Sequence, residues 1–162
     1  MRDFDLNGLR LAEYQARLFE LSSTKMGCSS AIFIRRFLHS DLLKLLDENE
    51  SSRIVLDANE GIQKILDQFG ESEYGKEKFS KESLFWMGYL YRYISYTREI
   101  DTPLLFKLFN YKKVNELYYV YHTQSMEWCV ENLLLLYNLD ENIFNKNWRL
   151  KRAIKQQQMK EL

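Results

Sequence analysis

The sequence contains few of the residues that interrupt helices: one proline and six glycines in 162 residues. Proline and glycine are the strongest breakers of regular structure, so their scarcity predicts helices joined by short connections. No segment alternates apolar and polar residues over a length typical of a strand, and no internal repeat is present. We therefore expect an all-α fold, a compact bundle of about seven to eight short and medium helices.

Cysteine is also scarce, since the chain has only Cys28 and Cys129. Two cysteines far apart exclude the disulfide framework of small secreted domains and predict two reduced thiols. No apolar stretch follows the first residues, and no run approaches the roughly 18 apolar residues that a membrane span needs. We expect a cytoplasmic protein with no membrane partner, and leave its self-association open.

The motifs of common catalytic and cofactor sites are missing. Neither His39 nor His122 stands near a cysteine at zinc-ligand spacing. The glycines are isolated, so the chain has no glycine-rich phosphate loop and no Gly-x-Ser-x-Gly elbow. A helical ribonuclease motif would need a wider spacing than that between Arg35 or Arg36 and His39. We therefore expect a protein that is not an enzyme and that holds no metal ion and no cofactor.

An overall excess of one charge is absent, because 23 basic residues match 23 acidic ones, but the charges are unevenly distributed. Residues 1–75 contain nine basic and thirteen acidic groups (a sum of −4), whereas residues 76–162 contain fourteen and ten (a sum of +4). We expect residues 1–140 to form a single helical domain, with 141–162 as a basic C-terminal helix or an extension of that domain. A basic end suits nucleic acid or an acidic partner, and a solvated helix end explains it equally well.

The spacing of apolar residues and the capping residues place the helices along the chain. The expected helices cover residues 6–21, 31–46, 57–69, 80–99, 104–109, 112–121 and 125–137, and a last one begins near 141. The expected N-caps are Ser29 or Ser30, Ser80, Thr102 (before Pro103), and Thr123 or Ser125. Gly70 is expected to end the third helix.

Aromatic residues, in contrast, are abundant. Fourteen of the 24 lie between Phe79 and Trp128, and the densest part is the helix pattern of residues 83–99. One helix cannot bury rings on every side unless other helices, or another protein, cover it. The surplus of rings therefore predicts a surface at which a second macromolecule docks.

Arg92 lies among these rings and has two interpretations. Helical spacing places it near Tyr89 and Tyr96, where its guanidinium could stack on rings and pair with a carboxylate, for which Glu99 is the nearest candidate. The alternative is a pocket with aromatic walls for an anion or a base. Gly88, on the same face, predicts that another helix approaches closely there.

Three segments resemble a known group of proteins. The first contains Arg35-Arg36-Phe37 followed by Ser40-Asp41, and the second is Trp86-Met87-Gly88-Tyr89-Leu90-Tyr91-Arg92-Tyr93. The third begins with Tyr121-His122-Thr123 and continues into an acidic helix up to Glu131. Over roughly residues 29–139 the chain resembles small helical bacterial proteins that are proposed to be antitoxins of toxin–antitoxin pairs. The resemblance implies a protein that neutralises a cognate toxin by direct binding.

An antitoxin that acts by contact needs rigid anchors that fill pockets on the toxin, and it needs no catalytic groups. The expected partner-binding residues are Tyr89, Arg92, Tyr93, Tyr96, Tyr118, Tyr119 and Trp128. The alternative function is a helical regulator that binds nucleic acid, such as operator DNA, through the basic C-terminal helix.

Overall fold

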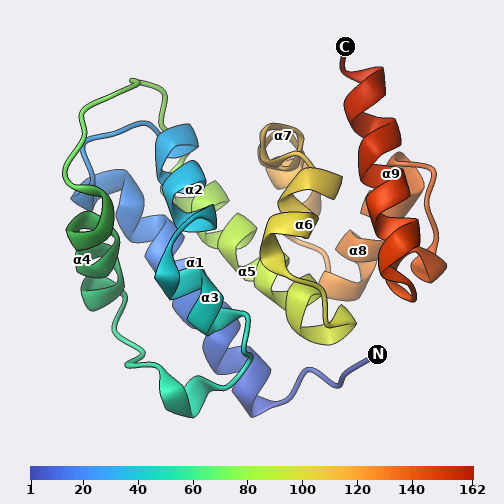
Figure 1. The fold of residues 1–162 in the computed structure, drawn as a ribbon, viewed down its shortest axis with the longest axis horizontal. Coiled ribbons are helices and arrows are strands. Elements are labelled where there is room, and N and C mark those ends of the chain that lie inside the picture. The colour runs from blue at the N-terminus through green and yellow to red at the C-terminus, as the bar shows by residue number, and fades with distance from the viewer.

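The computed structural model describes residues 1–162 and confirms an all-α fold with no strand (Figure 1). Helices take up 71% of the chain, and eight of the nine α-helices are at least seven residues long. The α-helices are α1 (Leu6–Lys25), α2 (Ser30–Leu38), α3 (Asp41–Leu46), α4 (Ala58–Phe69), α5 (Lys81–Arg98), α6 (Thr102–Leu108), α7 (Tyr111–Tyr121), α8 (Met126–Leu136) and α9 (Asn147–Lys160). Two short 3-10 helices complete the fold, η1 (Ser51–Arg53) and η2 (Glu141–Phe144).

The single helix expected over residues 31–46 is wrong, because the structure has two helices there. Ser40 has an extended backbone, and its Oγ accepts a hydrogen bond from the backbone N–H of Leu43 at 3.1 Å, so it caps α3. The apolar stripe runs through both helices, which is why periodicity alone does not reveal the break.

Most of the expected helix ends are confirmed. Ser29, Ser80 and Ser125 are the N-caps of α2, α5 and α8, each accepting from the backbone N–H three residues later. Gly70 ends α4 with a φ of +79°, in the left-handed region that favours glycine. The last helix begins later than expected, because η2 and a short turn occupy residues 141–146.

The most extensive helix contact is the crossing of α1 and α5 (Figure 1). At the crossing, a Cβ atom on Gly88 would lie 2.8 Å from the backbone oxygen of Gln15 and 3.0 Å from the Cα of Ala16. The side chain of Gln15 donates a hydrogen bond to the carbonyl of Gly88 at 3.0 Å. This confirms that Gly88 allows a second helix to approach closely.

Side chains from all nine α-helices form one hydrophobic cluster of 38 buried residues. α9 belongs to it through Leu150, Ala153 and Ile154, and α9 packs against α6. Figure 1 shows α9 at one end of the molecule, beside α8 and α6. Both cysteines are free and buried, and burial raises the pKa of Cys129 to about 11.

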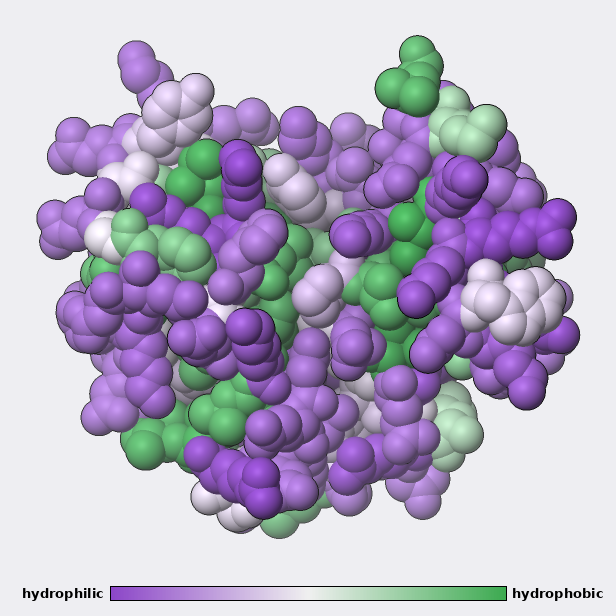
Figure 2. Space-filling model, viewed as in Figure 1, coloured by the Kyte–Doolittle hydropathy of each residue, from purple (hydrophilic) through white to green (hydrophobic).

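The surface is mostly hydrophilic on the face shown in Figure 2, but apolar patches interrupt it. One patch, at the lower left, lies over the segment between η1 and α4, where Val55 and Leu56 are exposed. The most exposed rings are Tyr119, Tyr74 and Trp148. None of the helices combines the length and the apolar character needed to cross a membrane.

Candidate functional site

Arg92 lies inside the protein and has no exposed surface. Its Nη1 donates hydrogen bonds to Asp47 Oδ1 at 2.9 Å and to the carbonyl oxygen of Leu46 at 3.2 Å, and its Nε donates to Gln15 Oε1 at 2.9 Å. The carboxylate that pairs with it is therefore Asp47, and the expectation of Glu99 is wrong. Glu99 is exposed and ends α5 with a left-handed backbone. Asp47 is 45 residues away in the sequence, so helical spacing does not reveal it.

Asp47 also holds the start of α6. Its Oδ2 accepts a hydrogen bond from the backbone N–H of Thr102 at 3.1 Å, and its Oδ1 accepts from the Thr102 hydroxyl at 2.7 Å. Thr102 is therefore not the cap expected from the sequence; Asp101 occupies the N-cap position and makes no side-chain bond there. Burial lowers the pKa of Arg92 and the charge of Asp47 opposes this shift, so the guanidinium stays charged. The pair joins α3, α5 and α6 and contributes to the fold.

Tyr93 and Tyr96 are also buried, and the N-terminal segment of the chain itself covers them. The Tyr96 hydroxyl donates to Asp5 Oδ1 at 2.6 Å, and the Arg2 guanidinium lies 4.2 Å from the Tyr96 ring centre. The ring of Phe4 packs edge-on against Tyr93 at 4.9 Å. Within this fold these two tyrosines and Arg92 face other parts of the chain rather than solvent.

The other expected residues lie at the surface, and two of them line a groove between α1, α5 and α7. We call this the aromatic groove, and it has a volume of about 580 Å³. The residues that line it are Arg17, Glu20, Glu82, Phe85, Trp86, Tyr89, Tyr118, His122 and Met126. Its size is within the range of about 300–1,000 Å³ typical of binding pockets.

Helical spacing brings the walls of the groove together. Phe85 and Tyr89 are four residues apart on α5, so they lie one above the other on the same face. Across from them, Arg17 of α1 pairs with Glu20 at 2.5 Å, and its guanidinium lies 5.3 Å from the Phe85 ring centre. The close crossing at Gly88 sets the distance between these two walls.

Trp86 is the deepest ring of the groove, with 5% of its surface exposed. Its indole Nε1 is buried and has no hydrogen-bond acceptor within the protein. Buried polar groups of this kind nearly always have a partner, so this indole N–H is an unsatisfied donor inside the protein. The ring packs edge-on against Tyr118 at 5.9 Å.

Tyr118 in turn stacks on His122, with 4.4 Å between the ring centres. His122 Nδ1 lies 2.8 Å from the carbonyl oxygen of Tyr118, which only accepts, so Nδ1 carries a proton. Nε2 then lies at the rim of the groove without a hydrogen-bond partner in the protein. Burial raises the pKa of Tyr89, with a contribution from Glu13, so its phenol is uncharged at neutral pH.

Tyr119 and Trp128 lie next to the aromatic groove. Tyr119 is 83% exposed, and its ring centre is 5.5 Å from that of Tyr118. Trp128 is half-buried and packs edge-on against Tyr121, whose ring also contacts Trp86. The structure thus brings four of the seven expected residues to one region of the surface: Tyr89, Tyr118, Tyr119 and Trp128.

Sequence reasoning missed most of the groove's other residues. Phe85 and Trp86 stand in the aromatic helix pattern, so the pattern itself could have included them. Arg17 and Glu20 come from α1, and nothing in their own sequence indicates that α1 crosses α5. No serine, threonine or cysteine lines the groove, so its chemistry is that of ring stacking, ion pairing and hydrogen bonding.

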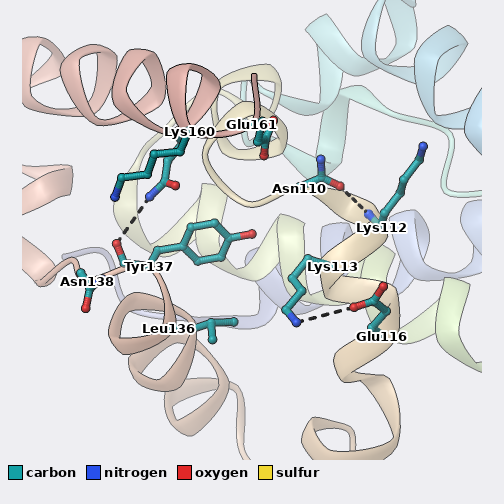
Figure 3. A pocket seen from close by; sticks show the side chains of 10 residues that line it. Asn110, Lys112, Lys113, Glu116, Leu136, Tyr137, Asn138, Lys160 and Glu161 are labelled. Carbon is teal, nitrogen blue, oxygen red and sulfur yellow. Dashed lines mark hydrogen bonds and ion pairs between the residues drawn. The ribbon is translucent and has the colours of Figure 1, made fainter.

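A second hollow lies between α7, α8 and α9 and has a volume of about 510 Å³ (Figure 3). Figure 3 shows Tyr137 projecting into it and Lys113 paired with Glu116, whose charged atoms are 3.6 Å apart. Apart from Leu136 and Tyr137, the residues that line it are polar or charged. This hollow has one ring where the aromatic groove has four, so it offers fewer rigid anchors to a partner.

Comparison of the chain with models of protein families, with curated proteins and with solved structures finds no significant match.

Proposed function

We propose that this protein is not an enzyme and acts by binding another protein through the aromatic groove. The observation that carries the proposal is the gathering of Phe85, Trp86, Tyr89 and Tyr118 at one groove. Tryptophan and tyrosine in such settings are enriched among residues that dominate binding energy. The resemblance described above points to a bacterial toxin as the partner, which the protein would neutralise by direct contact.

The groove suits an apolar or aromatic side chain of the partner that inserts between the rings. Tyr119 does not line the groove but lies next to it, so its exposed ring would add contact area for the partner. Rings with few rotatable bonds lose little conformational entropy on binding, which favours affinity. Such binding neutralises the toxin if the inserted segment lies at the toxin's substrate site.

Co-expression with the product of a neighbouring gene tests the partner. We expect the neighbour alone to stop growth, and co-expression to restore growth and give a complex that survives gel filtration. Replacing Tyr118 with alanine removes one wall of the groove and should weaken the complex at least about 30-fold, or about 2 kcal/mol. Isothermal titration calorimetry on the purified partners measures this change.

Tyr74→Ala is the matched control, since Tyr74 is an exposed tyrosine outside the groove. Circular dichroism should show that both variants retain the helix content of the natural protein. If expression of the neighbouring gene alone does not stop growth, its product is not a toxin and the proposed partner is excluded. If the Tyr118→Ala and Tyr74→Ala variants bind the partner with equal affinity, the groove is excluded as the binding surface.

One observation favours a second candidate function, a regulator that binds nucleic acid such as operator DNA. Lys151, Arg152 and Lys155 lie on the exposed face of α9, and none of them forms an ion pair within the protein. Unpaired cations along one helix face attract the phosphates of a duplex.

The triple variant Lys151→Gln/Arg152→Gln/Lys155→Gln tests this second function. If α9 contacts phosphates, affinity for duplex DNA should fall with salt, and the triple variant should make the log–log slope shallower by about 3. Fluorescence anisotropy over a range of salt concentrations measures the slope. An unchanged slope, or no binding by the natural protein at low salt, would contradict the proposal.

A further inference from the structure

A third hollow lies between α2, α4 and the loop that follows α4, away from the aromatic groove. We call it the arginine pocket, and its volume is about 630 Å³. It is lined by Ile32, Arg35, Arg36, His39, Phe69, Ser72 and Tyr74. Figure 1 shows α2 and α4 on the same side of the molecule, with the loop arching away from the end of α4, and the two helices are in contact. The pocket contains the Arg-Arg segment, to which the proposed function gives no role.

The charge of the arginine pocket is of one sign. Arg35, Arg36 and His39 line it, no lining residue carries a carboxylate, and neither arginine has an acidic partner within 4 Å. Basic residues in the last turn of a helix do complement the helix dipole, and α2 ends here. That effect accounts for the charge at the helix end but not for the rings and hydroxyl groups that enclose it. Two guanidinium groups with no counter-charge favour an anion.

The donors of the pocket are held in place by the fold. Arg36 Nη1 donates to the carbonyl oxygen of Gly70, and the guanidinium lies 5.8 Å from the Phe69 ring centre. His39 Nδ1 donates to the carbonyl oxygen of Arg35 at 2.8 Å, which fixes the orientation of the ring beside the pocket. Arg35 is exposed and keeps all its side-chain donors. An anion at this place would meet donors from two successive arginines.

Two aromatic rings line the pocket beside these donors. The rings are those of Phe69, which is half-buried, and of Tyr74, which is 75% exposed. Ser72 Oγ accepts from the backbone N–H of Tyr74 at 3.1 Å, so its own hydrogen is free to donate to a ligand. Rings of this kind stack on nucleobases, because every base has a flat face.

We propose that the arginine pocket binds a mononucleotide unit. Its phosphate lies against Arg35 and Arg36, and its base stacks on the exposed ring of Tyr74. A guanidinium group binds two oxygens of a phosphate through parallel hydrogen bonds, which a lysine could not form. The unit is either a free nucleotide or the 5′-phosphorylated end of a nucleic acid strand. This site is separate from the aromatic groove, and neither proposal depends on the other.

Isothermal titration calorimetry of the full chain with AMP, adenosine and inorganic phosphate tests the proposal. We expect AMP to bind at least tenfold more tightly than either adenosine or phosphate, because each of those lacks one half of the recognised group. The double variant Arg35→Gln/Arg36→Gln should weaken AMP binding at least 30-fold. Arg53→Gln, a change of an exposed arginine outside the pocket, should leave it unchanged.

Arg36 also bonds to Gly70, so the double variant could weaken AMP binding by disturbing the loop after α4. A second variant, which keeps this bond, separates the two causes. Tyr74→Ala removes an exposed ring and should lower the affinity for AMP toward that for phosphate. A 5′-phosphorylated oligonucleotide that binds more tightly than AMP would identify a strand end as the ligand, and one that binds no more tightly would identify the free nucleotide. Failure of both AMP and the oligonucleotide to bind, or binding that the double variant retains in full, would overturn the proposal.

Discussion

Replacing Asp47 with alanine is expected to lower the free energy of unfolding by about 3–5 kcal/mol, because it leaves the charge of Arg92 buried without a counter-ion. Arg92 has no exposed surface and only 14% of the Asp47 side chain is exposed, so the charge of each depends on the other. The substitution also removes the acceptor of the Thr102 hydroxyl and backbone N–H. Folded domains are typically stable by only about 5–15 kcal/mol, so much of the native population would be lost. Urea denaturation measures the effect.

Glu48→Ala is the matched control for this prediction. Glu48 is adjacent in sequence and pairs with Arg53 at 3.2 Å, but both side chains are about half exposed. Exposed pairs of this kind contribute about 0–1 kcal/mol. In the Asp47→Ala background, a second change, Arg92→Met, should cost less than Arg92→Met alone, since it removes the unpaired charge. Similar losses for Asp47→Ala and Glu48→Ala would contradict a buried ion pair that stabilises the fold.

Replacing Gly88 with alanine is expected to destabilise the protein by about 1–3 kcal/mol. Intrinsic helix propensity alone predicts the opposite sign, because alanine favours a helix over glycine by about 1 kcal/mol. The new methyl group would lie 2.8 Å from the Gln15 carbonyl oxygen and 3.0 Å from the Ala16 Cα, and both are backbone atoms that cannot rotate away. The crossing of α1 and α5 would have to open. Thermal and urea denaturation measure the sign and size of the change.

Gly61→Ala provides the comparison within the same protein. Gly61 lies in α4, and the closest atoms to its added Cβ would be the Tyr14 hydroxyl and a Leu18 methyl group, both at the ends of side chains. These atoms move more easily than backbone, so the loss should be smaller than for Gly88→Ala. A stabilised Gly88→Ala variant would show that the two helices are not held at close contact.

Opening this crossing would also move the walls of the aromatic groove. Arg17 and Glu20 stand on α1 and Phe85 stands on α5, so the distance between the helices sets the width of the groove. We therefore expect Gly88→Ala to weaken partner binding even though Gly88 itself does not line the groove. Gly88→Ala thus tests both the helix packing, through the free energy of unfolding, and the proposed function, through the affinity for the partner.

Local signals predicted the helices well where they act over a few residues. Serine at Ser29, Ser80 and Ser125 satisfies a free backbone N–H three residues later, and this needs no other part of the chain. The same rule was misapplied at Thr102, whose hydroxyl bonds instead to Asp47, 55 residues away in the sequence. The Thr102 hydroxyl bonds to the Asp47 carboxylate, which the fold brings close, and so it does not cap its own helix.

The sequence by itself determined the helical class, most helix ends and the position, Gly88, at which another helix can approach closely, because each depends on backbone preferences or side-chain size within a few residues. Only the tertiary structure decided which rings are covered: the N-terminal segment buries Tyr93 and Tyr96, while Tyr89 and Tyr118 remain at the aromatic groove. Only the tertiary structure likewise gave Arg92 its partner, Asp47. Burial and ion pairing depend on which distant segments meet, and the spacing of residues along one helix carries no information about that.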